Sequence, residues 1–252
     1  MINLEGRRLF IMGGSRGIGR AAAVMAAEAG ADVAVSYVRD FGAAADTIRK
    51  IESFGRRAIA LKADVLSEAA IAGAIERASD ALGGLDGLVV SAGIYSGAAI
   101  EEITLEFWNR MIAVNLTGTF LTVKAAVPVL RRSEGGASIV IYSSIAGLTG
   151  SAHYSAYATS KGSQVLFMKS MAWELASDGI RVNCIAPGWT DTDLARGSIE
   201  AIGRAKVEAE CPLGRIAQPF DVAGATVYLL SDLARFVTGI TLTLDGGKNM
   251  RG

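Results

Sequence analysis

The chain has 252 residues, of which 51% are hydrophobic, and its 25 Lys and Arg balance its 25 Asp and Glu. A neutral chain this apolar can bury enough surface to offset the entropy of ordering, so disorder is excluded. The charge balance also excludes a general attraction to nucleic acid or to an anionic membrane. The single His153 and the distant Cys184 and Cys211 lack metal-ligand spacing, so we expect no bound metal and no disulfide scaffold.

The sequence shows no sign of export. Its first eight residues lack the basic stretch and the apolar run of a secretion signal. No stretch reaches the roughly 20 apolar residues that are needed to span a bilayer. We therefore expect a cytoplasmic protein that binds neither membrane nor nucleic acid.

Strand-length apolar runs alternate with helix-length stretches along the chain. In chain order, the pattern predicts a strand at 9–12, a helix at 17–29, a strand at 32–37, a helix at 41–54, a strand at 58–61, a helix at 67–82, a strand at 85–90, a helix at 105–130, a strand at 138–142, a helix at 154–176, a strand at 181–185, a helix at 218–230 and a strand at 241–244. Ser67 is the expected N-cap of its helix, and Pro128 marks a kink or an end. Strands this apolar have both faces covered, which predicts an α/β protein with a parallel sheet between two layers of helices.

No linker, charge run or repeat divides the chain, so we expect residues 1–252 to form one domain. Residues 189–213 alone show no clear periodicity. A stretch of this length is either a lid over a site or a surface excursion.

A glycine-rich turn follows the first predicted strand and runs into a helix; it reads Gly13-Gly14-Ser15-Arg16-Gly17-Ile18-Gly19. Glycine lets the backbone approach a phosphate closely, and a helix N-terminus presents free N–H groups with a favourable dipole. The spacing is neither the common GxGxxG fingerprint nor a P-loop. The turn indicates a phosphate site for a cofactor, with a tight-packing turn as the alternative.

Tyr157 and Lys161 lie four residues apart in a predicted helix and therefore share a face. An ammonium beside a phenol favours the phenolate, so Lys161 would lower the pKa of Tyr157 from about 10 and make it a usable proton donor or acceptor. Ser144 lies 13 residues upstream, just after a predicted strand, where open α/β sheets place ligands. Alone, such a pair is more often a surface accident, and its significance depends on these neighbours.

Taken in order, these motifs resemble those of the short-chain dehydrogenase/reductase family, over essentially the whole chain. The matching residues are Gly13, Gly17, Gly19, Asp64, Val65, Ala92, Gly93, Asn115, Ser144, Tyr157, Lys161, Pro187 and Gly188. The resemblance implies a single Rossmann-type domain, with a doubly wound parallel sheet of about seven strands and helices on both faces.

The resemblance also implies a hydride transfer between a nicotinamide cofactor and a carbonyl or secondary alcohol (EC 1.1.1.-). Tyr157 would act as general acid and base, and Lys161 would lower its pKa and hold the nicotinamide ribose. Ser144 would hydrogen-bond the developing alkoxide. Asn115 would hold a water that connects Lys161 to solvent. The nicotinamide would supply the hydride chemistry.

The end of the second predicted strand favours NADP(H), with NAD(H) as the alternative cofactor. Tyr37 stands where NAD-binding proteins place an acidic residue that binds the ribose 2′-hydroxyl. Arg16 and Arg39 could bind a 2′-phosphate. The other interpretation makes Arg39 a solvated charge and Asp40 a helix N-cap. The resemblance assigns further cofactor contacts to Ser15, Ile18, Asp64, Val65, Ala92, Gly93, Pro187, Gly188, Thr190 and Thr192.

The chain departs from the family pattern in two places. Met12 stands where many members have Thr, and Val90-Ser91 where they have two Asn before Ala92. Those polar residues usually tie the first turn to the end of the fourth strand. Ser91 can supply one hydroxyl there, whereas Met12 cannot hydrogen-bond usefully.

The expected walls of the substrate site lie at 94–97, 145–150, 153–154 and 189–213. They are mostly apolar or small, which suits an uncharged carbonyl compound. Ser144, Tyr154 and Trp189 are the candidate substrate contacts, and His153 is the wall or surface residue that an isolated histidine usually is.

Two alternatives remain open. The first is a 3-oxoacyl-carrier-protein reductase, in which Arg131 and Arg132 would meet an acidic carrier at the mouth of the site. Against it, Trp173 stands where such reductases often place Arg. The second, of another class, is a sensor that holds NADP without turnover.

The helices predicted at 105–130 and 154–176 carry apolar residues around most of their circumference. A helix that is apolar on two faces must bury the second face against something. Family members usually pair through these two helices, so we expect a homodimer or homotetramer. Residues 238–252 could add a second interface.

Overall fold

The computed structural model describes residues 2–250 and contains one sheet of seven parallel strands. The strands are β1 Arg8–Met12, β2 Asp32–Tyr37, β3 Ala58–Lys62, β4 Gly87–Val90, β5 Ala137–Tyr142, β6 Ile180–Pro187 and β7 Thr241–Leu244. Their order, β3-β2-β1-β4-β5-β6-β7, confirms the doubly wound Rossmann-type sheet. The order reverses between β1 and β4, and such a switch point opens a crevice at the carboxyl ends of the strands.

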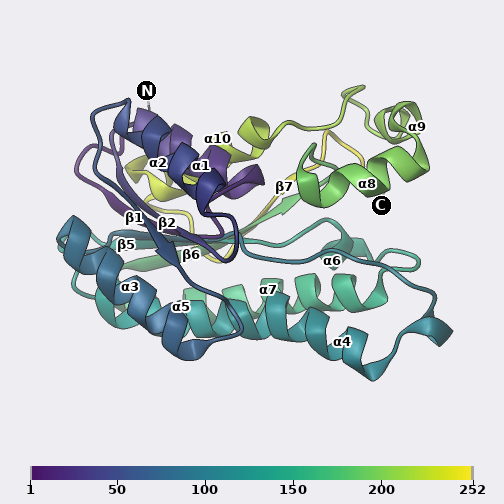
Figure 1. The fold of residues 1–252 in the computed structure, drawn as a ribbon, viewed down its shortest axis with the longest axis horizontal. Helices are drawn as coiled ribbons and strands as arrows, with labels where there is room; N and C mark the ends of the chain where they lie inside the picture. Colours follow the sequence, from purple (N-terminus) through teal and green to yellow (C-terminus); the bar gives the residue numbers. More distant parts are fainter. Residues whose placement is uncertain (1, 251–252) are drawn as a thin grey trace.

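Helices cover both faces of the sheet, as predicted (Figure 1). One face carries α1 Gly17–Glu28, α2 Phe41–Glu52 and α10 Pro219–Leu230, and the other carries α3 Glu68–Leu82, α5 Gly118–Leu130 and α7 Ser155–Glu174. Successive strand residues point to opposite faces. Phe10 and Ile139 therefore enter the core under α3, α5 and α7, whereas Ile11 and Val140 enter the core under α1 and α10.

Shorter elements complete the chain. They are α4 Leu105–Ile112, the π-helical turn η2 Ala113–Thr117, α6 Ala146–Thr149, α8 Asp193–Ile202, α9 Arg204–Ala209 and the 3₁₀ turns η1 Ile100–Glu102, η3 Ala176–Asp178 and η4 Asp232–Ala234. Ser67 caps α3 as predicted, since its side chain accepts from the amide of Ala70. The helix predicted at 105–130 is α4, η2 and α5 in succession, and it ends two residues beyond Pro128.

The lack of periodicity in residues 189–213 was misleading, because α8 and α9 form there. Each helix buries one side chain only, Ile199 in α8 and Val207 in α9, and both pack on Ile216. A short helix with one buried position leaves no repeating apolar pattern to detect.

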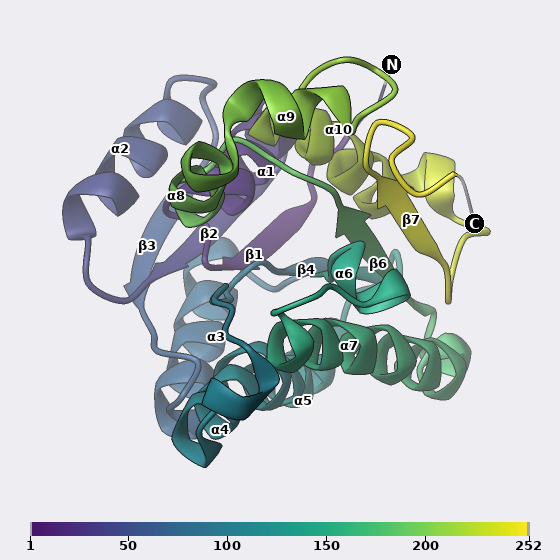
Figure 2. The same cartoon turned by 90° about the vertical axis from the view of Figure 1, so that its right-hand side faces the viewer.

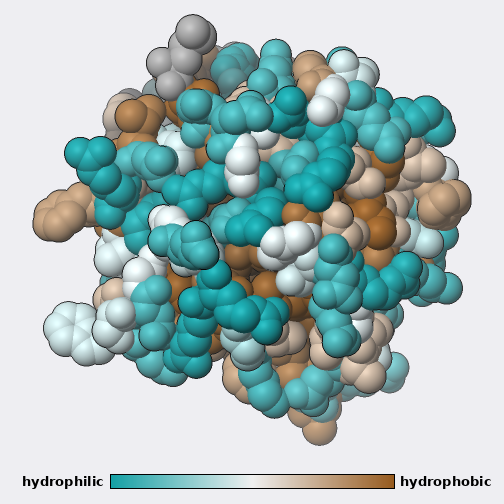
Figure 3. Space-filling model, turned by 90° about the vertical axis from the view of Figure 1, so that its left-hand side faces the viewer, coloured by the Kyte–Doolittle hydropathy of each residue, from teal (hydrophilic) through white to brown (hydrophobic). Residues whose placement is uncertain are grey.

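The two ends of the sheet differ in the elements around them. At the carboxyl ends of the strands lie α4, α6, the start of α7 and the α8–α9 pair (Figure 2). The opposite end is mostly hydrophilic, with hydrophobic groups scattered over it (Figure 3). Because open α/β sheets bind ligands at the carboxyl ends of their strands, we expect the site at that end.

The sequence led us to expect no stretch long and apolar enough to span a bilayer, and one helical segment departs from this expectation. Leu105–Leu130 is long and apolar enough, by length and composition, to cross a membrane, with a mean hydropathy of 1.4 in its most apolar window. In this fold its parts pack against α3 and α7 as members of a helix layer.

Candidate active site

The glycine-rich turn requires its glycines. Gly13 has a φ of +83°, and a Cβ there would lie 2.8 Å from the amide nitrogen of Ala92. A Cβ on Gly19 would lie 2.3 Å from the carbonyl oxygen of Gly13 and 2.8 Å from the hydroxyl of Ser91. The turn therefore packs against the end of β4, and α1 begins at Gly17 with its N-terminus beside the crevice.

The polar contact of this turn comes from a residue that the sequence did not indicate. The amide of Gly13 donates to the hydroxyl of Ser36 at 2.8 Å, and that hydroxyl lies 2.9 Å from the sulfur of Met12. Met12 therefore does take part in a polar contact, which corrects the expectation. Ser91 reaches Met12 through its backbone, since its amide donates to the carbonyl of Met12 at 2.9 Å.

The two arginines expected to bind a 2′-phosphate lie in the glycine turn and in the segment after β2. Arg16 immediately precedes α1, and Arg39 follows β2 one residue beyond Val38; both are exposed. Within residues 2–250 neither guanidinium forms an ion pair with a carboxylate, so both remain available to an anion. Asp40 caps α2 by accepting from the amide of Ala43 at 2.9 Å.

The other expected cofactor residues lie mostly at or just after the carboxyl ends of the strands. Gly93 follows β4, and a Cβ there would lie 3.2 Å from Oδ1 of Asn115 and 3.6 Å from Nζ of Lys161. The methyl group of Thr192 lies 3.6 Å from the Cβ position of Gly17, so the chain before α8 closes over the glycine turn. The remaining members of the set have local roles. Asp64 accepts from the amide of Leu66, Val65 packs against Gly118, Thr190 donates to the carbonyl of Gly188, Pro187 ends β6, and Ser15 accepts from Thr47 through its carbonyl.

Ser144, Tyr157 and Lys161 converge beside this crevice. Ser144 follows β5, and Tyr157 and Lys161 lie one turn apart near the start of α7. The hydroxyl of Ser144 lies beside the phenol of Tyr157 and accepts from the amide of Ala146 at 3.2 Å. Nζ of Lys161 lies 5.9 Å from the ring centre of Tyr157 and donates to the carbonyl of Tyr142 at 2.7 Å.

The electrostatics of the pair differ from the expectation that Lys161 lowers the pKa of Tyr157. Burial raises the pKa of the Tyr157 phenol, and the neighbouring hydroxyl of Ser144 opposes this only in part. Burial also lowers the pKa of Lys161 to about 8. The reason is that both groups are withdrawn from water, and the ammonium is directed at the carbonyl of Tyr142 and not at the phenol.

Asn115 lies in the π-helical turn between α4 and α5. Its side chain accepts from the amide of Ile94 at 2.8 Å and donates to the carbonyl of Ile94 at 3.0 Å and the hydroxyl of Ser160 at 3.1 Å. It therefore holds the loop after β4 against α7. A π-helical turn leaves carbonyls without their usual helical partners, and such turns are frequent at functional sites.

Gln164 is a site residue that the sequence reasoning missed. Its Nε2 donates to the main-chain carbonyl of Asn115 and to the hydroxyl of Thr119, both at 2.7 Å. It is fully buried, three residues beyond Lys161. A glutamine one turn after Lys161 on the same helix face was the available signal, because such a residue must find polar partners when buried.

Four aromatic rings meet beside the phenol of Tyr157. The ring of Tyr95 is stacked on Tyr154, with centres 4.8 Å apart. It also meets Tyr157 at 4.9 Å and Trp189 at 6.2 Å, both nearly at right angles. Tyr154 and Trp189 were expected here, whereas Tyr95 had been included only as part of the 94–97 wall.

Known proteins are similar to this chain in sequence and in fold. A family model described as enoyl-(acyl carrier protein) reductase matches residues 13–249. The L-rhamnose 1-dehydrogenase (NAD(P)(+)) of a Sphingomonas species is 38% identical over 97% of this chain and 96% of its own. The cis-4-hydroxycyclohexanecarboxylate dehydrogenase of Sinomonas cyclohexanicum is 40% identical over 94% of each chain. A short chain dehydrogenase from Burkholderia cenocepacia, solved in complex with NADP, matches with a TM-score of 0.91 and 35% identity, over 98% of this chain and 99% of that one.

The chain belongs to the short-chain dehydrogenase/reductase family. As a member of this family it is an oxidoreductase with a nucleotide-binding Rossmann fold. The resemblance drawn from the ordered motifs is thereby confirmed.

The structure places the basic residues of the carrier-protein alternative at the wrong end of this short-chain dehydrogenase/reductase. Arg131 and Arg132 follow α5 and precede β5, which is the amino end of the strand. Ser144 follows the carboxyl end of the same strand. Arg131 is also paired with Asp178 at 2.8 Å. Neither arginine lies at the mouth of the site, because the whole of β5 separates them from it.

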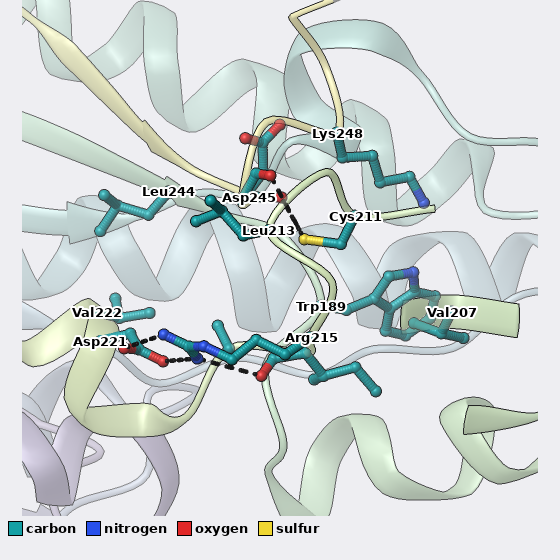
Figure 4. A pocket seen from close by; sticks show the side chains of 13 residues that line it. Trp189, Val207, Cys211, Leu213, Arg215, Asp221, Val222, Leu244, Asp245 and Lys248 are labelled. Carbon is teal, nitrogen blue, oxygen red and sulfur yellow. Dashed lines mark hydrogen bonds and ion pairs between the residues drawn. The ribbon is translucent and has the colours of Figure 1, made fainter. Parts of the chain in front are cut away.

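A cavity of about 170 Å³ lies next to Trp189, between α9 and the segment after β7 (Figure 4). Its wall includes Cys211, whose thiol donates to the carbonyl of Asp245 at 3.3 Å. Both cysteines are free thiols, and in residues 2–250 no three His, Cys, Asp or Glu side chains group together as metal ligands would.

Proposed function

We propose that this short-chain dehydrogenase/reductase interconverts small, uncharged secondary alcohols and ketones with NADP(H) as cofactor. The observation that carries the proposal is the convergence of Ser144, Tyr157 and Lys161 at the carboxyl ends of the strands, beside the glycine turn. NAD(H) is the alternative cofactor. We assign residues 1–252 to one cytoplasmic catalytic domain, with residues 189–213 as its lid and with no need for metal, nucleic acid or membrane.

Tyr157 is the proton carrier of the proposed reaction. Its raised pKa keeps the phenol protonated at neutral pH, so it can donate a proton to the oxygen of a ketone during reduction. In the oxidation it accepts the hydroxyl proton. Ser144, held beside Tyr157, donates to the substrate oxygen as negative charge develops there. Asn115 holds the loop after β4 against α7, and thereby fixes the position of that loop relative to Tyr157.

The residues present fit a nicotinamide dinucleotide. The glycine turn presents the N-terminus of α1 to a pyrophosphate, and Gly17, the first residue of α1, places no side chain there. Lys161 would hold the nicotinamide ribose, and Thr192 closes over the turn. When bound, the nicotinamide supplies or accepts the hydride.

The residues at the end of β2 favour NADP(H), and both cofactors occur among the relatives. Tyr37 ends β2 where an acid would bind the 2′-hydroxyl of NAD(H), and neither Arg39, two residues later, nor Arg16 of the glycine turn has a carboxylate partner within residues 2–250. Among the relatives, the rhamnose dehydrogenase is named for both cofactors and the Burkholderia protein was solved with NADP. A guanidinium fork suits a phosphate dianion well.

The decisive experiment combines NADPH titration with a panel of ketones and alcohols. Consumption of NADPH with a ketone, abolished in Tyr157→Phe, supports the proposal. Tight NADPH binding with no turnover of any compound would favour the sensor alternative. Reduction of a 3-oxoacyl thioester on carrier protein, with inactivity toward small ketones, would favour the carrier-protein alternative.

A further inference from the structure

Tyr95 joins the three other aromatic rings of the crevice into one wall. It contacts Tyr154, Tyr157 and Trp189, which come from the start of α7, from α7 itself and from the loop after β6. All four residues are only partly buried. The wall directly adjoins the phenol of Tyr157, since Tyr95 contacts that ring.

The stacked pair is held in place by a strained turn. His153 has a φ of +64° and is the one non-glycine residue with a positive φ between residues 2 and 250. Its carbonyl accepts from the amide of Ala98 at 2.7 Å. A Cβ on Gly97 would lie 2.6 Å from the ring of Tyr154, so the loop that carries Tyr95 is pressed directly onto that ring. Strain of this kind persists where the surrounding structure fixes it, and it clusters at ligand sites.

The wall is neutral. Burial raises the pKa of the Tyr95 phenol, and the neighbouring Tyr154 raises it further, so the hydroxyl stays protonated. The charges next to Trp189 are paired: Arg204 contacts Asp191 at 2.7 Å, and Lys248, whose ammonium lies 6.0 Å from the centre of the Trp189 ring, contacts Glu210 at 2.6 Å. The wall therefore consists of ring faces, ring edges and neutral hydroxyls, with one paired ammonium over Trp189.

We propose that Tyr95, Tyr154 and Trp189 form an aromatic clamp that selects cyclic secondary alcohols and ketones over open-chain ones, with Tyr95 as the specificity-determining residue. A ring presents a flat, rigid C–H face that packs on an aromatic surface. An open chain must lose rotamer freedom to do the same between rigid walls. The inference rests on the proposed function, because the reacting carbon has to lie beside Tyr157 and Ser144.

Matched six-carbon pairs test the clamp. We would measure kcat/KM for cyclohexanol against 2-hexanol with NADP⁺, and for cyclohexanone against 2-hexanone with NADPH. The wild-type protein should prefer the ring by about ten-fold or more, and Tyr95→Leu should lower this ring-to-chain ratio about five-fold or more. Tyr95→Phe keeps the ring and should keep the ratio. Phe236→Leu removes a fully exposed ring outside the cluster and serves as the control.

The outcomes separate the clamp from the hydride transfer. Equal or better use of the open-chain compounds, or an unchanged ratio in Tyr95→Leu, overturns the clamp and leaves the oxidoreductase proposal intact. No turnover of any of the four compounds overturns both. If circular dichroism shows that Tyr95→Leu does not fold, the wild-type ratio and the ratio in Trp189→Leu decide the question.

Discussion

The phenol of Tyr157 experiences two opposing influences. Burial raises its pKa, and the neighbouring hydroxyl of Ser144 lowers it in part. The net effect keeps the proton on the oxygen at neutral pH, which prepares the residue to act as an acid. Its role as a base in the oxidation then requires a proton to leave a buried site, so oxidation should become faster as the pH rises.

Tyr157→Phe removes that proton and keeps the ring. We expect turnover to fall about 10²-fold or more, which is the scale of general acid–base catalysis, while NADPH binding persists because the ring packing is unchanged. Steady-state kinetics and a fluorescence titration with NADPH measure the two effects separately. A variant that retained most of its turnover would show that another group carries the proton.

The double variant Arg16→Ala/Arg39→Ala tests the cofactor preference. Each arginine would make charge-assisted bonds to the 2′-phosphate, and such bonds contribute about 1.5–3 kcal/mol each. We expect NADPH to bind ten-fold or more weakly and NADH to bind almost as before, measured by titration of each cofactor. Equal weakening of both would contradict the NADP(H) assignment.

Lys161 gives a stability prediction with a defined sign. Its pKa in the folded protein is about 8, against 10.5 for the free side chain, so between these values the unfolded chain binds more protons than the folded one. The contribution of Lys161 to the free energy of unfolding therefore increases with pH across this window, by at most about 1.4 kcal/mol per pH unit. Denaturant unfolding of the wild type and of Lys161→Met, compared from about pH 7 to about pH 10, measures this increase.

An exposed lysine outside α7 provides the control for that comparison. Lys62→Met should leave the pH dependence of the unfolding free energy unchanged, since Lys62 is exposed at the end of β3, away from the outer side of α7. A flat difference between the wild type and Lys161→Met across the window would show that Lys161 is not withdrawn from water.

At the scale of elements, the glycine turn depends on the close approach of two backbone segments. A Cβ on Gly19 would lie 2.3 Å from the carbonyl oxygen of Gly13, so Gly19→Ala must push β1 and α1 apart. We expect a loss of about 1–3 kcal/mol in stability, which is typical of overpacking, together with at least ten-fold weaker NADPH binding. Thermal or denaturant unfolding and cofactor titration measure both.

Gly73 offers a matched control for Gly19. It also lies in a helix, α3, and a Cβ there would meet nothing within 4 Å. Gly73→Ala should therefore stabilise the protein by up to about 1 kcal/mol through helix propensity alone. If Gly19→Ala behaved like Gly73→Ala, the turn would not be tightly packed.

Elements with strong periodicity could be predicted from the sequence, and others could not. The buried strands and the N-caps Ser67 and Asp40 are determined by local residue chemistry, and the structure confirms them. The π-helical turn at Asn115 contains ordinary helical residues, so nothing local marks it. The Ser36–Gly13 contact and the position of Tyr95 depend on how β2 and the loop after β4 meet other segments, which only the tertiary fold decides.

At the scale of the whole molecule, the helix layer made of α3, α5 and α7 has exposed apolar side chains on the side that faces away from the sheet. Val165, Met168 and Ala172 of α7 are buried against the sheet, as the pattern required. On the outer side, Leu166 and Trp173 remain 67% and 90% exposed, and Phe120 of α5 remains 44% exposed. This exposed side also explains why the segment 105–130 is apolar enough to pass a composition test for membrane spans.

The last prediction is that this apolar side is covered by a second copy of the chain. Leu166 and Trp173 are seven residues apart on α7 and so share one helix face, and a repeated apolar face on a long helix is suited to a self-complementary two-fold contact. Light scattering at micromolar concentration should show a dimer or tetramer and no stable species near the 26.2 kDa mass of one chain. Leu166→Glu/Trp173→Glu should shift the mass toward one chain, since each charge would be buried without a partner. Leu233→Glu, which changes an exposed apolar residue elsewhere, should leave the mass unchanged, and a wild-type protein of 26.2 kDa would refute the prediction.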